Sequence, residues 1–536
     1  MASYRYINKE IQYRFNNKRG MNMQSNNTPL LTAHLFVLKK NSWDGFDEML
    51  KRLNENGITV KLYEPNDALL DINPKNPRVY VSLGENVEQF STLYAMPYHE
   101  RKRWLHYKSP ADIQPGYLFY CWLNRTDPLP KNKIIPDIQF SSDTPLVSVF
   151  TAAYKSKEKI QRPYRSLLNQ TYTNWEWVIV DDSGDEDATY NQDLLPLDDP
   201  RVRRFRQDYR NGYIGATKRY AAGLCTGEIL VEVDHDDELT PDCLEKIVHT
   251  FQKHPECGFA YGESAEVYVG SNDAQWYGWD CGFGYGIYYR VWVHEMNRWQ
   301  NVLRNTVING TTIRHLVGLP NHPRAWTREC YHLLGGHREE LLVADDYDML
   351  VRSFLCTRYV CIPDLVYIQY RNENGDNSTF TRNQQIQILV SELYRYYSER
   401  IHARVNELGV HEYVSYSRVW EREPNDVALK AANIINEDSS RISMLFPIPY
   451  SCSAIKHDQL ITTIQKGIET NFKEIEVVVV GYIPEEVESF ASKAPMGAIR
   501  WWPMEPKDSL ETCIQYAKFC SSCKEKVVIL PESLQE

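Results

Sequence analysis

The amino-acid sequence predicts an α/β protein whose largest part is a doubly wound sheet. Short apolar runs alternate with amphipathic stretches through the middle of the chain, and a similar alternation occurs nearer the N-terminus. This alternation indicates βαβ units with right-handed crossovers. At 536 residues the chain is too long for one hydrophobic core, so several domains are expected.

The central domain is expected at residues 140–384, after a linker rich in Pro, Lys and Asp. Apolar runs predict its strands, and amphipathic runs predict its helices. In chain order we expect a strand at 146–154, a helix at 156–170, strands at 176–182 and 201–207, a helix at 215–225 and a strand at 228–237.

The flanking segments have their own patterns. Residues 1–28 are polar and rich in Asn, which is typical of a flexible tail, and residues 29–139 predict a small α/β accessory domain with a parallel sheet and the linker. Residues 385–435 are expected to form a helical connector. Its amphipathic helix begins at Gln385 and stops at Gly409.

The C-terminal segment 436–536 resembles the central domain. RISMLFPIPY matches the pattern of LVSVFTAAY, and the segments that follow match in the same order. The acidic residues are not repeated, because Gly481 and Tyr482 stand where the central domain has Asp181 and Asp182. This pattern predicts a truncated, non-catalytic copy.

Bulk composition excludes some functions. The net charge of -11 argues against general nucleic-acid binding, which needs clustered Lys and Arg. No apolar run is long enough to predict a membrane span, so we expect a cytoplasmic protein. A homo-oligomer is left open.

Polar residues stand at the ends of three predicted strands. They are Thr151 and Tyr154 of the segment TAAY, the pair Asp181 and Asp182, and the cluster from Asp234 to Asp237. Ligands of open α/β sheets bind beyond the carboxyl ends of the strands, and carboxylates with diphosphate oxygens suit a hard divalent cation. Plain turns with capping carboxylates are the alternative explanation.

Four motifs carry a resemblance to the family 2 glycosyltransferases of the GT-A fold. In order they are VSVFTAAYK, SLLNQTYTNWEWVIVDDSGDED, GATKRYAAGLCTGEILVEVDHDDELTP and RAWTRECYHLLGGHREELLVADDYDMLVRS. The resemblance implies a Rossmann-like, nucleotide-diphospho-sugar transferase (GT-A) sheet, a C-terminal GT-A-like repeat and a glycosyltransferase activity. Its order and spacing make it specific.

The site assignments combine this resemblance with local chemistry. By resemblance, Asp346 is the general base, and Asp234 and Asp236 hold the diphosphate and Mn²⁺ or Mg²⁺. The residues expected to bind the donor nucleotide are Ala152, Tyr154, Asp182, Lys218 and Asp234. Candidates for contacting the acceptor or supporting the site are Asp345, Gly336 and Arg371.

Several alternatives remain open in the sequence. Asp345 and Asp346 would also suit the N-terminal end of a helix. Gly336 would let a loop approach the sugar, and Arg371 lies next to a segment that is equally a plain turn. An ordinary core or surface histidine is the default for His315, His322 and His337, with a metal or acceptor contact as the alternative. The aromatic segment 275–299 suits either an acceptor platform or core packing.

The expected reaction is a single displacement that inverts the anomeric carbon. Inversion is implied by the resemblance. An Asp paired with a base edge suits uracil, so a UDP-sugar is the expected donor, and a glycan is the favoured acceptor among several hydroxyl compounds. The rival hypotheses are an inactive scaffold built of glycosyltransferase-like modules and a sugar-1-phosphate nucleotidyltransferase. A nucleotidyltransferase would need a Gly-rich phosphate-binding loop near the first strand of the central domain, and this sequence has no such Gly run there.

Overall fold

A computed structural model describes most of the chain, in two compact units. The first unit lies within residues 1–125, 374–396 and 413–421, and the second within 126–373, 397–412 and 422–536. The predicted tail 1–28 lies outside the described residues. The described residues are 29–38, 43–69, 76–129, 137–183, 195, 198–206, 212–269, 287–304, 308–310, 312–315, 318, 320–371, 381–410, 431–449, 462, 474–481, 485–503 and 509–530.

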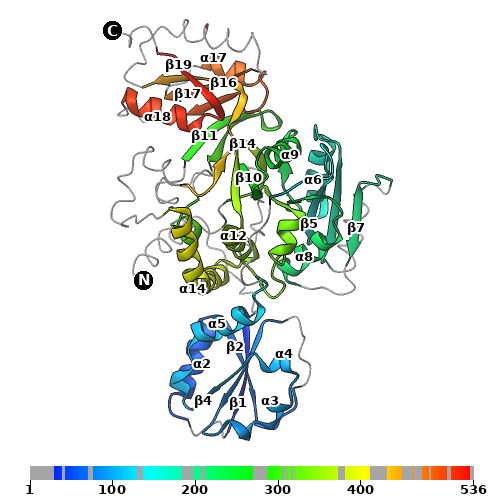
Figure 1. The fold of residues 1–536 in the computed structure, drawn as a ribbon, viewed down its shortest axis with the longest axis vertical. Helices are drawn as coiled ribbons and strands as arrows, with labels where there is room; N and C mark the ends of the chain where they lie inside the picture. Colours follow the sequence, from blue (N-terminus) through cyan, green and yellow to red (C-terminus); the bar gives the residue numbers. More distant parts are fainter. Residues whose placement is uncertain are drawn as a thin grey trace. The chain divides into compact units, whose positions relative to one another are not determined.

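The first unit contains a four-stranded sheet in the order β2-β1-β3-β4 (Figure 1). All three strand pairs are parallel, as the sequence predicts. The strand β4 was not expected from the sequence. The elements are β1 (Leu31–Val37), α2 (Phe46–Glu55), β2 (Ile58–Tyr63), β3 (Arg78–Leu83), α3 (Ser91–Ala95), α4 (Tyr98–Arg101), β4 (Trp104–Tyr107) and α5 (Pro115–Thr126).

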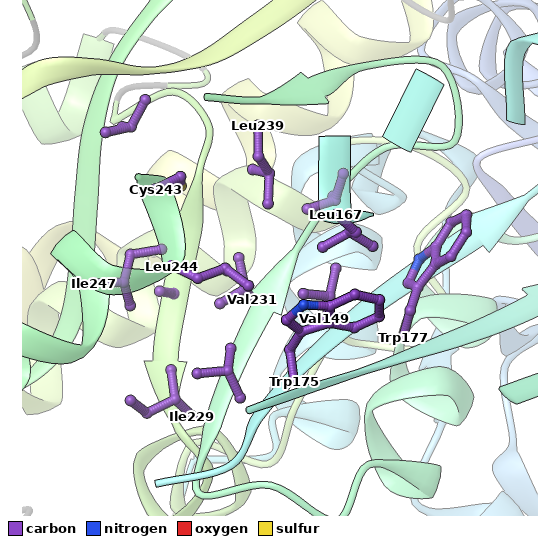
Figure 2. Close-up of a cluster of buried hydrophobic side chains, with 14 of the residues drawn as sticks. Val149, Leu167, Trp175, Trp177, Ile229, Val231, Leu239, Cys243, Leu244 and Ile247 are labelled. Carbon is purple, nitrogen blue, oxygen red and sulfur yellow. The ribbon is translucent and has the colours of Figure 1, made fainter. Parts of the chain in front are cut away.

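The second unit begins with four parallel strands in the order β8-β5-β6-β7. This order and the helices between the strands confirm the predicted βαβ pattern. Figure 2 shows the apolar core of this part, in which Val149, Val231 and Leu244 are buried. The elements are β5 (Val147–Ala153), α6 (Gln161–Leu168), β6 (Trp175–Asp181), β7 (Val202–Arg206), α8 (Ile214–Leu224), β8 (Ile229–Glu232) and α9 (Cys243–Lys253).

Beyond β8 the sheet continues through antiparallel strands. β13 lies between β8 and β10 and is antiparallel to both, while β14 runs parallel to β10. This part supplies the second group of site residues. Its elements are β9 (Glu238–Leu239), β10 (Cys257–Tyr268), β11 (Ile287–Val293), β12 (Arg298–Arg304), α10 (Thr312–His315), β13 (Arg324–Thr327), α11 (Arg328–Leu333), α12 (Asp345–Cys356) and β14 (Arg358–Arg371).

The C-terminal strands have the same order as the central strands. They run β19-β16-β17-β18, all parallel, and β18 pairs with β11, so they extend the central sheet (Figure 1). The elements, with the helix α14 that precedes them, are α14 (Asn383–Leu408), β15 (Ile434–Ile435), β16 (Asp438–Ile448), β17 (Ile475–Gly481), α17 (Glu485–Ala491), β18 (Ile499–Trp502), α18 (Leu510–Cys520) and β19 (Cys523–Val528). The helix α14 confirms the predicted amphipathic helix, which stops at Gly409 with φ +68°.

The two sets of strands also share one buried hydrogen-bond pattern. Glu176 of β6 accepts hydrogen bonds from Ser148 Oγ at 2.6 Å and from the amide of Thr226 at 2.6 Å. Glu476 of β17 accepts from Ser443 Oγ at 2.5 Å and from the amide of Ser522 at 2.9 Å. An arginine of the next strand pairs with each carboxylate, Arg203 with Glu176 and Arg500 with Glu476.

The aromatic segment is partly described. Its residues 275–286 lie outside the described part of the chain, while the rest forms the antiparallel pair of β11 and β12. Trp292 and Trp299 pack against Trp501 and other C-terminal side chains, with 5.5 Å between the rings of Trp299 and Trp501. In the described portion the rings therefore serve core packing. Among the described residues, no helix has the length and apolarity needed to cross a membrane.

Candidate active site

The acidic cluster is separated from the end of β8 by one residue, and its last aspartate, Asp237, is hydrogen-bonded to β14. Asp237 is buried and accepts hydrogen bonds from the Tyr367 hydroxyl and the Tyr370 amide, each at 2.8 Å. Burial, together with repulsion from Asp236 and Asp234, raises the pKa of Asp237 well above its usual value. Asp237 therefore anchors the loop to β14.

The two predicted metal ligands have different surroundings. The Asp234 side chain is 31% exposed, and its backbone amide donates to the Tyr367 hydroxyl at 3.2 Å. Asp236 is almost buried, and its carbonyl oxygen accepts a hydrogen bond from Arg162 at 2.9 Å. Of the two carboxylates, that of Asp234 is the more accessible to a ligand.

Glu232, the last residue of β8, is the centre of a buried charge cluster. Its Oε1 atom lies 2.8 Å from Lys218 Nζ, 3.3 Å from His322 Nε2 and 3.4 Å from Arg324. Its Oε2 atom lies 3.2 Å from His337 Nε2. A carboxylate without access to water needs such partners, because an uncompensated buried charge is very costly.

The cluster fixes the charge states of its members. Burial alone would raise the pKa of Glu232, but Lys218 and the two histidines hold it well below its usual value. Burial alone would lower the pKa of Lys218, yet the carboxylates of Asp345 and Glu232 raise it well above normal. Both groups are therefore charged at neutral pH.

The two aspartates at the start of α12 differ in exposure. Asp345 is buried, with its Oδ2 atom 3.4 Å from Lys218 Nζ. The Asp346 side chain is 31% exposed, and its Oδ2 atom lies 3.2 Å from Arg324. Ala344, immediately before them, has the uncommon left-handed φ of 58°, a conformation found often at functional sites.

The pKa values of these aspartates move in opposite directions. For Asp345, burial and repulsion from Asp346 prevail over the attraction of Lys218 and raise the pKa. For Asp346, burial is outweighed by Arg324 and Lys218, so the pKa is lowered. Asp346 is therefore an ionised and accessible carboxylate at neutral pH.

One group of side chains in the described part of the chain has the chemistry of a divalent-cation site. One ligand atom each from Glu232, Asp234 and His322 lies within 4.8 Å of the others. His322 is buried, and its Nδ1 atom has no hydrogen-bond partner. Its ring stacks on Tyr367 at 4.9 Å, which holds the imidazole beside Asp234. Carboxylate donors suit Mn²⁺ and Mg²⁺, and the imidazole adds a nitrogen donor of the kind that binds transition-metal ions, so the residues fit a divalent cation.

The predicted donor residues lie at the carboxyl ends of β5 and β6. Ala152 is the penultimate residue of β5, and Tyr154, whose side chain is exposed, comes directly after the strand. Asp182 follows β6, and its Oδ2 atom accepts a hydrogen bond from the Gly212 amide at 2.7 Å. The Asp182 amide in turn donates to the carbonyl oxygen of Ala153 at 2.9 Å, which joins the two strand ends.

Lys218 lies on α8 and contacts two of the acidic residues. It is buried, and it bridges Glu232 and Asp345. Helix α8 approaches α12 closely at Gly215, where an added Cβ atom would lie 2.5 Å from the Arg338 carbonyl oxygen and 3.1 Å from Asp345 Cβ. The contacts of Lys218 therefore join the β8 carboxylate to the start of α12.

The remaining predicted residues have local partners. Gly336 has φ +66°, and an added Cβ atom would lie 2.9 Å from the Tyr331 ring, whose hydroxyl contacts His337. Arg371 ends β14 and pairs with Glu266 of β10 at 3.1 Å. The side chain of His315 lies outside the described part.

Sequence reasoning missed two residues of this cluster, Glu232 and Arg324. Glu232 had a signal, because it interrupts the apolar run ILVEV. Arg324 had none nearby, because its partners Glu232 and Asp346 are distant in the chain. For His322 the sequence alone favours an ordinary histidine, with a metal contact as the alternative.

Part of the central domain matches a known protein family. Residues 148–307 match the family described as Glycosyl transferase family 2. The chain is 28% identical over 208 residues to chondroitin synthase of Escherichia coli, covering 39% of this chain and 26% of that one. It is 27% identical over 239 residues to hyaluronan synthase of Pasteurella multocida, covering 44% and 21%.

A third relative is named for its substrates. It is the UDP-Glc:alpha-D-GlcNAc-diphosphoundecaprenol beta-1,3-glucosyltransferase WfgD of Escherichia coli, 28% identical over 120 residues, covering 22% of this chain and 46% of that one. The matched region spans less than half the length of each of these three curated relatives.

Two solved structures match parts of the chain with low identity and low TM-scores. S. aureus TarS 1-349 in complex with UDP-GlcNAc has 18% identity and a TM-score of 0.33, covering 51% of this chain and 78% of that one. GalNAc-T7 with UDP, GalNAc and Mn2+ has 14% identity and a TM-score of 0.35, covering 53% and 57%.

The fold and the site define an α/β sheet with carboxylates gathered at one sheet edge. With the family match, they confirm the predicted GT-A-type fold. Residues 148–307, within the central domain, match the family 2 glycosyltransferases that the resemblance indicated.

Proposed function

We propose that this protein is a metal-dependent, inverting glycosyltransferase that moves a sugar from a UDP-sugar to an acceptor hydroxyl. One observation carries the proposal. Carboxylates from β8 and from α12 are joined by the buried cluster around Glu232, although more than a hundred residues separate them in the chain. Glycosyl transfer requires two groups close together: one that neutralises charge on the diphosphate and one that takes the proton of the acceptor hydroxyl.

The donor is proposed to bind over the ends of β5, β6 and β8. Asp182 would accept a hydrogen bond from the uracil, near the exposed ring of Tyr154 and the backbone of Ala152. Lys218, a buried cation whose pKa is raised by Asp345, Glu232 and Asp234, would attract the donor diphosphate. Two relatives are named as synthases of chondroitin and hyaluronan and a third for a UDP-Glc donor, which supports a sugar nucleotide.

A divalent cation, Mn²⁺ or Mg²⁺, would be held by Asp234 and His322, with Asp236 as a third ligand. When bound, such an ion would neutralise charge on the departing diphosphate. Glu232 already has Lys218, His322, Arg324 and His337 as neighbours, so we assign it to orienting these groups and not to the cation.

Asp346 is proposed as the general base. The acceptor oxygen attacks the anomeric carbon, the bond from that carbon to the diphosphate oxygen breaks, and the acceptor proton passes to the Asp346 carboxylate. Asp346 suits this role better than Asp345, because its side chain is partly exposed and its pKa is lowered. One displacement inverts the anomeric centre.

The proposed acceptor is a glycan. Release of UDP from UDP-glucose, UDP-galactose, UDP-GlcNAc and UDP-glucuronate, with Mn²⁺ and with chondroitin or hyaluronan oligosaccharides, tests the proposal. We expect UDP release from at least one donor and its loss in EDTA. No release from any donor would favour the alternative of an inactive scaffold.

A further inference from the structure

Arg324 contacts both acidic segments of the site. It lies in β13 directly opposite Glu232 of the antiparallel strand β8. One terminal nitrogen of its guanidinium lies 3.4 Å from Glu232 Oε1, and the other lies 3.2 Å from Asp346 Oδ2. A single buried side chain therefore touches a carboxylate of each acidic segment.

The second link between the same segments does not reach Asp346. Lys218 joins Glu232 to Asp345, with distances of 2.8 and 3.4 Å from its Nζ atom. Asp346 has its own second contact, because its Oδ1 atom accepts a hydrogen bond from the Tyr347 amide at 2.8 Å. One carboxylate oxygen is thus fixed by the helix and the other by Arg324.

We propose that Arg324 is a positioning residue, which holds the Asp346 carboxylate at a set distance from Glu232 and so from the metal-binding end of β8. This inference rests on the proposed function, because it takes Asp346 as the base. Arg324 itself does not need to touch the substrate. Its effect would pass through Asp346. Without Arg324, only the hydrogen bond from the Tyr347 amide to Oδ1 would restrict rotation of the Asp346 carboxylate.

The planar guanidinium is essential to this role. Its two terminal nitrogens are held at a fixed separation and can serve two carboxylates at once. A lysine keeps the charge but offers one compact ammonium group, so it would favour one carboxylate at the expense of the other. Arg324→Lys therefore keeps the positive charge and removes the simultaneous contact with both carboxylates.

The test measures Arg324→Lys against the wild-type protein, by UDP release into water from the most reactive UDP-sugar in the presence of Mn²⁺. We expect kcat to fall by roughly 10- to 100-fold, because small displacements of a catalytic group have effects of that size. The donor KM and the Kd for UDP with Mn²⁺ should stay unchanged, since the donor-side residues are not altered.

Arg352→Lys is the matched control. Arg352 is also fully buried and also pairs with an α12 aspartate, Asp348, at 2.6 Å, but it contacts neither Asp346 nor Glu232. We expect this variant to lower the melting temperature and to keep kcat near the wild-type value. A general loss of packing would lower kcat in both variants.

The outcomes separate the two proposals. If the wild-type protein releases UDP and Arg324→Lys has the same kcat, the positioning role is wrong while the glycosyltransferase stands. If Arg324→Lys raises KM and leaves kcat unchanged, Arg324 contributes to donor binding and the inference is again wrong. If the wild-type protein releases no UDP from any donor, the proposed function itself fails.

Discussion

A carboxylate as buried as that of Glu232 stays charged only because several cationic neighbours share it. Lys218 and Arg324 supply permanent charge, and a ring nitrogen of each of the two histidines lies within 3.3 Å of the carboxylate. Removing one partner from such a group costs several kcal/mol, since the remaining charge is left uncompensated. At the scale of single residues, function and stability therefore depend on the same contacts.

Asp346→Asn tests the base without changing the size of the side chain. We expect kcat for UDP release to fall about 10²- to 10⁴-fold, the usual contribution of a positioned base. Binding of UDP with Mn²⁺, measured by calorimetry, should be retained. Turnover at the wild-type rate would show that another group takes the proton.

His34 gives the first unit a pH-dependent stability. It is buried beside Tyr63, and burial, with Lys61 and Arg78, lowers its pKa from 6.5 to about 4. The folded state therefore binds fewer protons than the unfolded state between these pH values, and stability falls as the pH falls below 6.5. From pH 7 to pH 5 the loss from this residue is about 2 kcal/mol.

The check compares urea unfolding of the full chain with that of His34→Gln at both pH values. The substituted protein should lose less stability on acidification, because a glutamine side chain cannot be protonated in this range. An equal loss in both proteins would contradict the assignment.

At the scale of elements, the site depends on how closely α8 approaches α12. Gly215 makes this approach feasible, because any side chain there would meet the Arg338 carbonyl oxygen and Asp345. A displacement of α12 would also move Asp346, which adjoins Asp345 in the first turn. Packing between these two helices therefore sets the geometry of the proposed base.

Gly215→Ala should lower both stability and kcat. Forcing a methyl group into a packed site typically costs about 1–3 kcal/mol, and here the displaced partner is the base-bearing helix. Gly223→Ala in the same helix is the control, because an added Cβ atom meets nothing within 4 Å. The control should gain up to about 1 kcal/mol in helix propensity and keep full activity. Equal activity in both variants would contradict the packing argument.

At the scale of the whole molecule, the C-terminal strands are part of the same sheet as the site. Val291 of β11 and Val478 of β17 share one apolar core, and Arg500 pairs with Asp364 of β14 at 2.9 Å. We propose that these strands are a degenerate copy of β8-β5-β6-β7, because strand order, register and the buried glutamate recur. The copy has lost its carboxylates and kept its structural contacts.

Arg500→Met tests this integration. Arg500 is fully buried among Glu476, Asp364 and Glu263, so its loss should destabilise the protein by about 3–5 kcal/mol. Arg203→Met removes the corresponding residue of the central strands, whose side chain is 32% exposed, and should cost on the order of 1 kcal/mol. Thermal and urea unfolding give both values. A small effect of Arg500→Met would indicate that the C-terminal strands are dispensable.

The sequence predicted the parts of this molecule that depend on local patterns. The strands β6 and β8, which lead to Asp182 and Asp234, follow from apolar periodicity, and the end of helix α14 follows from a Gly stop. The pairing of Arg324 with Asp346 could not be predicted, because it depends on β13 lying beside β8 and on where α12 begins. The addition of β18 to β11 was also missed, since no local pattern specifies an antiparallel partner.

The most direct test of the central claim is a crystal structure of the protein with UDP and Mn²⁺. The proposed function predicts the ion bound between the diphosphate and the Asp234 and His322 side chains, with the uracil beside Asp182 and the Asp346 carboxylate facing the space left for the acceptor. Nucleotide bound away from these residues, or bound without the ion, would contradict it.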